Sequence, residues 1–170
     1  MQAKVSIIMG STSDMPVMQE AAKILDQFQI PFEINALSAH RVPEQVMEFA
    51  KGAHKRGIRV IIAGAGGAAH LPGVVAALTP VPVVGVPCRS TISLDGWDSL
   101  LSIVQMPPGI PVATVGVDGG QNAGILAVQI LAAGDDVLLE EILKFKENLK
   151  TKILKANDDL KAFPFKFRVG

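Results

Sequence analysis

The 170-residue sequence contains a single cysteine, Cys88, so no intrachain disulfide is possible and the fold does not depend on oxidation. It has no excess of either charge, because 16 lysine and arginine residues balance 16 aspartate and glutamate residues. A neutral chain without a basic stripe lacks the electrostatic footprint of a nucleic-acid-binding protein. No apolar run approaches the roughly 18 uninterrupted residues of a membrane span, since glycine and proline interrupt each one. The N-terminal MQAKVSIIMG has no basic n-region or cleavage site, so we expect a cytoplasmic protein without nucleic-acid or membrane partners.

Several catalytic and binding motifs are also missing. HExxH, CxxC and any cluster of His, Asp and Glu are absent, and we therefore expect no metal. The chain contains neither a Walker A loop nor GxGxxG, so nucleotide triphosphate binding has no support. Cys88 follows a predicted strand without an identifiable base nearby, which favours a buried structural thiol over a nucleophile.

The pattern that is present alternates short β-branched runs with longer helical segments. Helical spacing is clear at Met18, Ala21, Ala22, Leu25 and Phe28, which fall on one face. Strand-helix alternation with short connections predicts parallel strands joined by right-handed crossovers. We predict an α/β fold, a flavodoxin-like three-layer α/β/α sandwich with a five-stranded parallel sheet and C-terminal helices; a TIM barrel needs eight units and roughly 250 residues. The predicted strands are residues 5–9, 32–37, 58–63, 81–86 and 111–115, followed by helices at 124–133 and 137–160.

The chain reads as one domain, residues 1–170, with a core at about 4–134 and a C-terminal helix and tail at 135–170. The tail after Leu160, KAFPFKFRVG, carries three phenylalanines without helical spacing. It is either a frayed end or a segment that packs on another subunit, and we favour packing.

Ligands of open parallel sheets bind at the carboxyl ends of the strands, so the five strand exits are the candidate site. They read GSTSD (10–14), SAHR (38–41), GAGGAAHLPG (64–73), PCRSTISLDG (87–96) and GVDGGQNAG (116–124). In the first exit a glycine, three hydroxyls and Asp14 stand at a helix N-terminus, an arrangement that suits a phosphate. The alternative is helix capping by Ser13 or Asp14, which explains one of these residues rather than the set.

The second exit, SAHR, places His40 and Arg41 where a strand ends and a helix begins. Pro43 fits the first helical position, which leaves Val42 as a poor N-cap. Arg41 offers planar, charge-assisted hydrogen bonds that suit a phosphate, and a histidine can exchange protons near neutral pH. A purely structural role for His40 is the alternative; its position at the sheet edge beside an arginine favours function.

The third exit, GAGGAAHLPG, allows the backbone to approach a ligand closely, because glycines lack side chains and reach unusual φ/ψ angles. A tight strand-to-helix turn would need fewer glycines than the segment contains. His70 stands among small residues and is a candidate ligand contact, whereas His54 lies beside Lys55 and Arg56 on a solvated face and has no assigned role.

Together these motifs resemble the PurE family of N5-carboxyaminoimidazole ribonucleotide mutases. The resemblance rests on GSTSD, SAHRVP, GAGGAAHLPG and GWDSLLSIVQMPPGIPVAT (96–114), and it runs from about Val5 to Leu131. It implies a flavodoxin-like fold, a homo-octamer, a small-molecule ribonucleotide substrate and no cofactor. The implied reaction is an isomerisation in purine (IMP) biosynthesis, in which a carboxylate moves from the exocyclic nitrogen to C4 of the imidazole ring.

The resemblance also implies roles for individual residues. His40 corresponds to the catalytic histidine. Phosphate and ribose contacts fall on Ser11, Ser13, Asp14 and Arg41, while Ser38, the backbone of Gly66 and Gly67, and His70 surround the ring and the migrating carboxylate.

Two positions depart from the family pattern. Members often carry threonine where Val42 stands, which weakens the cap. The loop after the fifth strand commonly resembles IGKAG-x-NA, whereas here Asp118 appears in VGVDGGQNAG, which puts the contribution of that loop in doubt.

A second branch of the family carboxylates aminoimidazole ribonucleotide directly with CO2, and its glycine-rich segment differs from GGAAHLPG, so the mutase is favoured. A non-catalytic flavodoxin-like module that binds a phosphorylated ligand is the other alternative.

Overall fold

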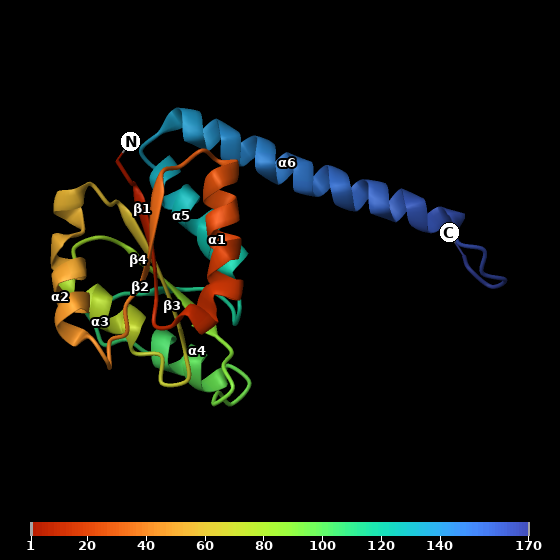
Figure 1. Ribbon diagram of the computed structural model, residues 1–170. Helices are drawn as coiled ribbons and strands as arrows, with labels where there is room; N and C mark the ends of the chain where they lie inside the picture. Colours follow the sequence, from red (N-terminus) through yellow and green to blue (C-terminus); the bar gives the residue numbers. More distant parts are fainter. Residues whose placement is uncertain (1, 170) are drawn as a thin grey trace.

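The computed structural model describes residues 2–169, which form a five-stranded sheet, six α-helices and three short 3₁₀ helices (Figure 1). In chain order the main elements are β1 (Val5–Met9), α1 (Met15–Gln27), β2 (Phe32–Ala36), α2 (Pro43–Gly52), β3 (Val60–Gly66), α3 (Leu71–Leu78), β4 (Val83–Cys88), α4 (Trp97–Val104), β5 (Ala113–Thr114), α5 (Gly120–Ala132) and α6 (Asp136–Asp159).

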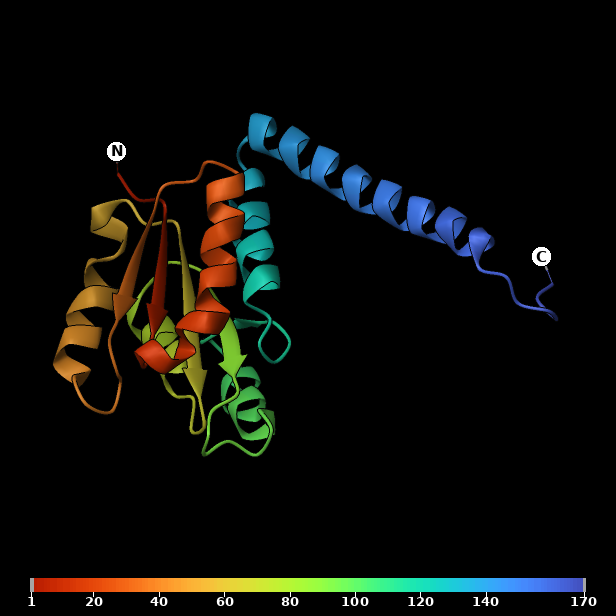
Figure 2. The same ribbon diagram turned by 45° about the vertical axis from the view of Figure 1, so that its right-hand side comes forward.

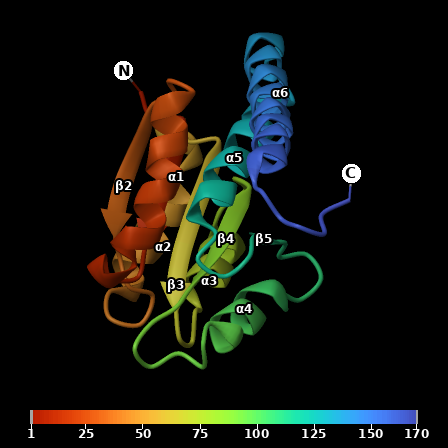
Figure 3. The same ribbon diagram turned by 90° about the vertical axis from the view of Figure 1, so that its right-hand side faces the viewer.

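The sheet is parallel throughout, with the strand order β2-β1-β3-β4-β5. This is the order of flavodoxin-like sheets, so the predicted fold class is confirmed. Val5 at the start of β1 pairs with Phe32 on one side and Val60 on the other, which aligns the carboxyl ends of the central strands at one edge. The first four predicted strand exits therefore meet at that edge, as Figure 3 shows from the side.

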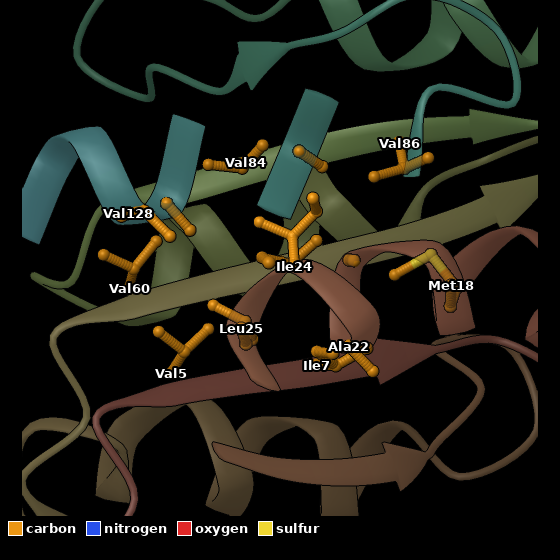
Figure 4. Packing of buried hydrophobic residues seen from close by; sticks show 14 of the residues in the cluster. Val5, Ile7, Met18, Ala22, Ile24, Leu25, Val60, Val84, Val86 and Val128 are labelled. Carbon is orange, nitrogen blue, oxygen red and sulfur yellow. The ribbon is translucent and has the colours of Figure 1, made fainter. Parts of the chain in front are cut away.

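Each face of the sheet is covered by its own apolar layer. Helices α1 and α5 cover one face, and Figure 4 shows their residues packed against β1, β3 and β4, with Ile24, Leu25, Val84 and Val128 at the centre. Residues of α2, α3 and α4 form a second cluster on the other face, including Val46, Val75 and Ile103. The central strands are buried on both faces, which explains why they read as continuous apolar runs rather than as alternating ones.

The structure corrects the predicted ends of several elements. β3 continues through Gly64, Ala65 and Gly66, and β4 continues to Cys88, because Ala65 pairs with Pro87 and Gly66 with Cys88. The first part of GAGGAAHLPG is thus strand rather than turn. β5 is only Ala113–Thr114, α5 begins at Gly120, and α6 spans Asp136–Asp159, one residue earlier at each end than predicted.

Helices α1 and α5 lie side by side because glycines line their contact (Figure 2). A Cβ on Gly120 would lie 2.0 Å from the backbone oxygen of Val17, and one on Gly124 would lie 2.9 Å from the backbone oxygen of Ala21. Backbone atoms of a packed helix cannot move aside as a flexible side chain can. The glycines therefore set the distance between the two helices.

Gly120→Ala is expected to destabilise the fold by about 1–3 kcal/mol, the usual cost of inserting a methyl group into a packed core. Its Cβ would overlap the Val17 oxygen, and this clash outweighs the better helix propensity of alanine. Gly134→Ala is the matched control, since nothing lies within 4 Å of a Cβ at that position. Thermal denaturation of both variants is the measurement; equal melting temperatures would contradict the proposed role of Gly120.

Helix α6 leaves the body of the protein (Figures 1 and 2). Only Ile142 of this helix is buried, and its Phe145 ring packs 5.5 Å from the ring of Phe28. Apart from these contacts, the helix and the following segment expose apolar side chains, among them Leu143, Leu149, Ile153, Leu154, Leu160, Phe163, Phe165 and Phe167. None of the helices within residues 2–169 is long and apolar enough to cross a membrane.

Candidate active site

A cavity of about 360 Å³ lies at the carboxyl edge of the sheet, where the chain leaves β1, β2, β3 and β4. Its walls come from four separate segments of the sequence. The lining residues are Gly10, Ser11, Ser13, Asp14, Ser38, Ala39, His40, Arg41, Ala65, Gly66, Ala68, His70, Leu71, Ser90, Thr91 and Ile92. All of the predicted site residues except Gly67 are among them.

The wall after β1 is a 3₁₀ turn, Thr12–Asp14, that leads into α1. The Ser11 side chain accepts a hydrogen bond of 3.2 Å from the backbone N–H of Ser13 and so caps this turn. Asp14 occupies the N-cap position of α1 without a side-chain capping bond, so capping by Ser13 or Asp14 is wrong. The Asp14 carboxyl group is buried instead in the cavity wall.

Burial raises the pKa of Asp14 above its ordinary value, and a hydrogen bond from the backbone of Ser11 offsets only part of this shift. The folded state therefore binds the Asp14 proton more tightly than the unfolded state does. The corresponding stabilisation is present at acid pH and is lost as pH rises through the raised pKa. At neutral pH an ionised Asp14 lowers stability.

Asp14→Asn is expected to raise the melting temperature at neutral pH, because asparagine fills the same space without a buried charge. The difference from the parent protein should shrink below about pH 3.8, the ordinary pKa of this group, where the parent carboxyl is protonated in both states. Melting curves between pH 3 and 8 test this. A variant less stable than the parent at neutral pH would contradict it.

The wall after β2 holds the SAHR segment in a turn. The Ser38 side chain accepts from the backbone N–H of His40 at 3.3 Å, and the Ser38 carbonyl accepts from Arg41 and Val42. Val42 is the N-cap of α2 without a side-chain bond, which confirms the predicted poor cap. Arg41 is exposed at the cavity and takes part in none of the ion pairs among residues 2–169, so its guanidinium is available to an anion.

The two histidines of the cavity contact each other directly. His40 Nε2 and His70 Nδ1 are 2.8 Å apart, and the rings meet edge to face with centroids 4.9 Å apart at 86°. One of the two facing nitrogens must carry the proton of this hydrogen bond, so the rings are placed to pass a proton between them. Sequence spacing does not reveal this pairing, because the residues are 30 positions apart.

The glycine-rich wall is tightly packed against the segment after β4. A Cβ on Gly66 would lie 2.9 Å from the Cys88 carbonyl oxygen and 3.0 Å from Ser90 Cβ. Gly67 has a φ of +60°, which favours glycine. Gly67 is buried beneath Ile92 and does not line the cavity, so the structure does not bring this predicted residue into the site.

One wall of the cavity contains no predicted site residue: it is formed by Ser90, Thr91 and Ile92, which follow β4. The sequence marks this segment as a strand exit, but the segment carries no histidine or glycine cluster that would indicate site residues. The available signal was topological, because β4 is the neighbour of β3 and its carboxyl end must share the edge.

Two other residues with reactive side chains, Cys88 and His54, are not part of the candidate site. Cys88 is fully buried, as predicted, and burial raises the pKa of its thiol to about 12, with smaller contributions from the charges of Asp14 and Asp118. A thiol with that pKa is a poor nucleophile at neutral pH. His54 is exposed in the short 3₁₀ turn His54–Arg56 and does not line the cavity.

A larger cavity of about 820 Å³ lies at the opposite end of the sheet, between the connection from α1 to β2 and the start of α6. Its walls include Lys4, Arg59, Asp135 and Phe145 but none of the predicted site residues. The smaller cavity is the better candidate site, because it lies at the carboxyl edge and combines an arginine, a histidine pair and a buried carboxyl group.

The strand order defines a flavodoxin-like α/β protein, and its candidate ligand site is the cavity at the carboxyl edge of the sheet. A family model described as AIR carboxylase matches residues 4–152. The chain belongs to this family.

Relatives and solved structures agree with this assignment. The N5-carboxyaminoimidazole ribonucleotide mutase of Pyrococcus abyssi is 60% identical over 147 residues, 86% of this chain and 84% of that relative. The chloroplastic phosphoribosylaminoimidazole carboxylase of Vigna aconitifolia is 56% identical over 153 residues, which are 90% of this chain and 27% of that longer protein. The crystal structure of Treponema denticola PurE superposes with a TM-score of 0.82 at 29% identity and covers 92% of this chain and 98% of that one.

Proposed function

We propose that this protein is an isomerase, an N5-carboxyaminoimidazole ribonucleotide mutase of purine biosynthesis. It would convert its substrate to 4-carboxyaminoimidazole ribonucleotide by moving a carboxylate from the exocyclic nitrogen to C4 of the ring. The observation that carries the proposal is the His40–His70 pair, which shares one cavity with Arg41 and the Ser11–Asp14 turn. A relative of that name covers most of the chain at 60% identity.

The cavity would have two ends, a phosphate end at Arg41 and the Ser11–Asp14 turn and a ring end at Ser38, Gly66 and His70. Arg41 and the hydroxyls of Ser11 and Ser13 would hold the phosphate, and Asp14 would accept a hydrogen bond from the ribose. Ser38, the Gly66 backbone and His70 would surround the ring and the migrating carboxylate. Binding energy from the phosphate, which does not react, would be spent on orienting the ring.

The reaction needs confinement and one proton transfer. The bond between the exocyclic nitrogen and the carboxylate breaks and releases CO2, and C4 then forms a new bond to the same carbon. C4 must lose its proton to restore aromaticity, and the exocyclic nitrogen gains one. A neutral His40 would take the proton from C4 and return it to the nitrogen, with His70 in hydrogen-bond contact as its partner. A small, walled cavity would keep CO2 near C4 long enough for recapture.

The alternative within the same family is direct carboxylation of aminoimidazole ribonucleotide with CO2 from solution. The name of the Vigna aconitifolia relative contains the word carboxylase, although the chain spans only 27% of that protein. The mutase is favoured because the Pyrococcus abyssi relative, which is covered over 84% of its length, carries the mutase name.

The test is to supply N5-carboxyaminoimidazole ribonucleotide and, in a parallel assay, aminoimidazole ribonucleotide, each without ATP, metal or biotin and in buffer that contains isotopically labelled bicarbonate. A mutase forms the C4-carboxylated product with little label, because the carboxylate stays in the cavity. A carboxylase forms product only from aminoimidazole ribonucleotide and fully labels it. A protein that binds either nucleotide without making product is a non-catalytic ligand-binding module, and the proposal fails.

We also propose a homo-octamer that acts in the cytoplasm. The exposed apolar side chains of α4, with Trp97 at 64% exposure, and those along α6 are surfaces that a second copy of the chain would bury. The phenylalanines of the C-terminal tail would join that contact. Sedimentation equilibrium of the protein measures the assembly, and a monomer at micromolar concentration would contradict it.

A further inference from the structure

The loop between β4 and α4, residues 89–96, carries a polar group with no partner. Ser90 Oγ is buried and is the one buried side-chain nitrogen or oxygen without a hydrogen bond among residues 2–169. Ser90 lines the cavity. Buried hydroxyls in folded proteins are nearly always paired, so an unpaired one in a cavity wall points to a partner that the ligand supplies.

The surroundings of Ser90 place it at the ring end of the cavity. A Cβ added to Gly66 would lie 3.3 Å from the Ser90 hydroxyl, so the Ser90 side chain is in close contact with the Gly66 backbone. Gly66 and His70, which the proposed function places against the ring and the migrating carboxylate, belong to the same segment and line the same cavity as Ser90. The Ser90 side chain can rotate about χ1 from one staggered position to another. Such a rotation would turn its hydroxyl toward a ligand that lies next to Gly66.

The position of Ser90 is fixed through the preceding residue. Asp118 Oδ1 accepts a 2.9 Å hydrogen bond from the backbone N–H of Arg89, and Asp118 Oδ2 lies 3.5 Å from Arg89 Nε. The backbone N–H of Asp118 donates to the Pro87 carbonyl at 2.8 Å. Asp118 thus joins the loop after β5 to both sides of Cys88, at the exit of β4.

Asp118 also adopts an unusual backbone conformation, with a φ of +56°. Residues other than glycine rarely take this conformation, and asparagine and aspartate are the least disfavoured. Arg89 Nε has a second acidic neighbour, Asp95 Oδ1 at 3.3 Å, but Asp95 makes no bond to the Arg89 backbone. The backbone hydrogen bond therefore distinguishes Asp118 from Asp95.

We propose that Ser90 donates a hydrogen bond to the substrate at the ring end of the cavity and that Asp118 is the positioning residue that holds Ser90 there. The hydrogen bond goes to an oxygen of the migrating carboxylate, which rests on the proposed function. Ser90 then helps to retain CO2 beside C4 between its release and its recapture, and Asp118 acts only through the Arg89 backbone.

The experiment compares Ser90→Ala, Asp118→Ala and the double variant. Each single change is expected to lower kcat/KM about 10-fold and to increase the label that product takes up from bicarbonate, because released CO2 escapes more often. The double variant should lose no more than about 10-fold, since both changes remove the same hydrogen bond. A 100-fold, additive loss would show that Asp118 does not act through Ser90.

Two conservative variants are the controls. Asp118→Asn keeps the acceptor for the Arg89 N–H and should stay within about 3-fold of the parent, whereas a role for the charge would make it as poor as Asp118→Ala. Asp95→Asn removes only the second ion pair and should be unchanged. Melting curves establish that each variant is folded, and a uniform loss of stability without extra label would mean a merely structural role.

Calorimetric binding of 4-carboxyaminoimidazole ribonucleotide separates this inference from the proposed function. If the parent protein binds this nucleotide but catalyses nothing, the mutase assignment fails, and weaker binding by Ser90→Ala still supports the contact. If the parent is an active mutase and Ser90→Ala matches it in binding, kcat/KM and label, the inference fails alone.

Discussion

Replacing His40 with asparagine is expected to lower kcat by roughly 10²–10⁴-fold, the usual contribution of a general acid–base group. Asparagine can fill the position and hydrogen-bond to His70, but it cannot carry the proton that C4 loses. Substrate binding should change little, because Arg41 and the Ser11–Asp14 turn remain. Single-turnover assays with calorimetric binding measure the two effects separately.

The chain supplies a matched control for this experiment. His54 is exposed, lies outside the cavity and contacts neither of the other histidines, so His54→Asn should retain full activity. His70→Asn removes the 2.8 Å contact to His40 but leaves His40 in place, and an intermediate loss is expected. Normal turnover by His40→Asn would remove His40 from the mechanism and leave His70 as the acid–base candidate.

The sheet could be predicted from the sequence because its strands are buried on both faces. Residues 5–9, apart from the buried Ser6, and residues 83–86 are apolar runs, and such runs with helices between them permit few folds. Strand ends were harder to predict, since glycine at 64 and 66 reads as loop. Pairing with β4 makes this segment strand, and that pairing is a tertiary interaction invisible to local pattern.

For the candidate site, too, the sequence indicates the residues that local pattern marks but not the contacts between them. Ser11, His40 and His70 stood out because polar residues at strand exits are chemically distinctive. Ser90 did not, because serine is common in loops and only its burial without a partner marks it. The contact between His40 and His70 depends on how two loops fold over the sheet edge, which no spacing rule encodes. Sequence therefore indicated the residue types and their edge, and the structure supplied the pairings.

Replacing Arg41 with methionine is expected to lower kcat/KM by roughly 10–10²-fold, the value of one or two charge-assisted hydrogen bonds. Methionine keeps much of the apolar stem and removes only the guanidinium. The loss should appear in kcat as well as KM, because phosphate binding energy orients the ring for carboxylate transfer. Steady-state kinetics over a range of substrate concentrations separates the two parameters.

Two comparisons decide whether the guanidinium itself binds the phosphate. Arg41→Lys keeps the charge but loses the planar pair of donors, so its activity should fall between the parent and Arg41→Met. Arg59→Met removes an exposed arginine at the amino end of β3, far from the candidate site, and should have no effect. If Arg41→Met loses activity against the full nucleotide but matches the parent against the dephosphorylated nucleoside, Arg41 contacts the phosphate. Equal losses with both substrates would instead assign Arg41 to the ring or the ribose, and the division of the cavity into a phosphate end and a ring end would be wrong.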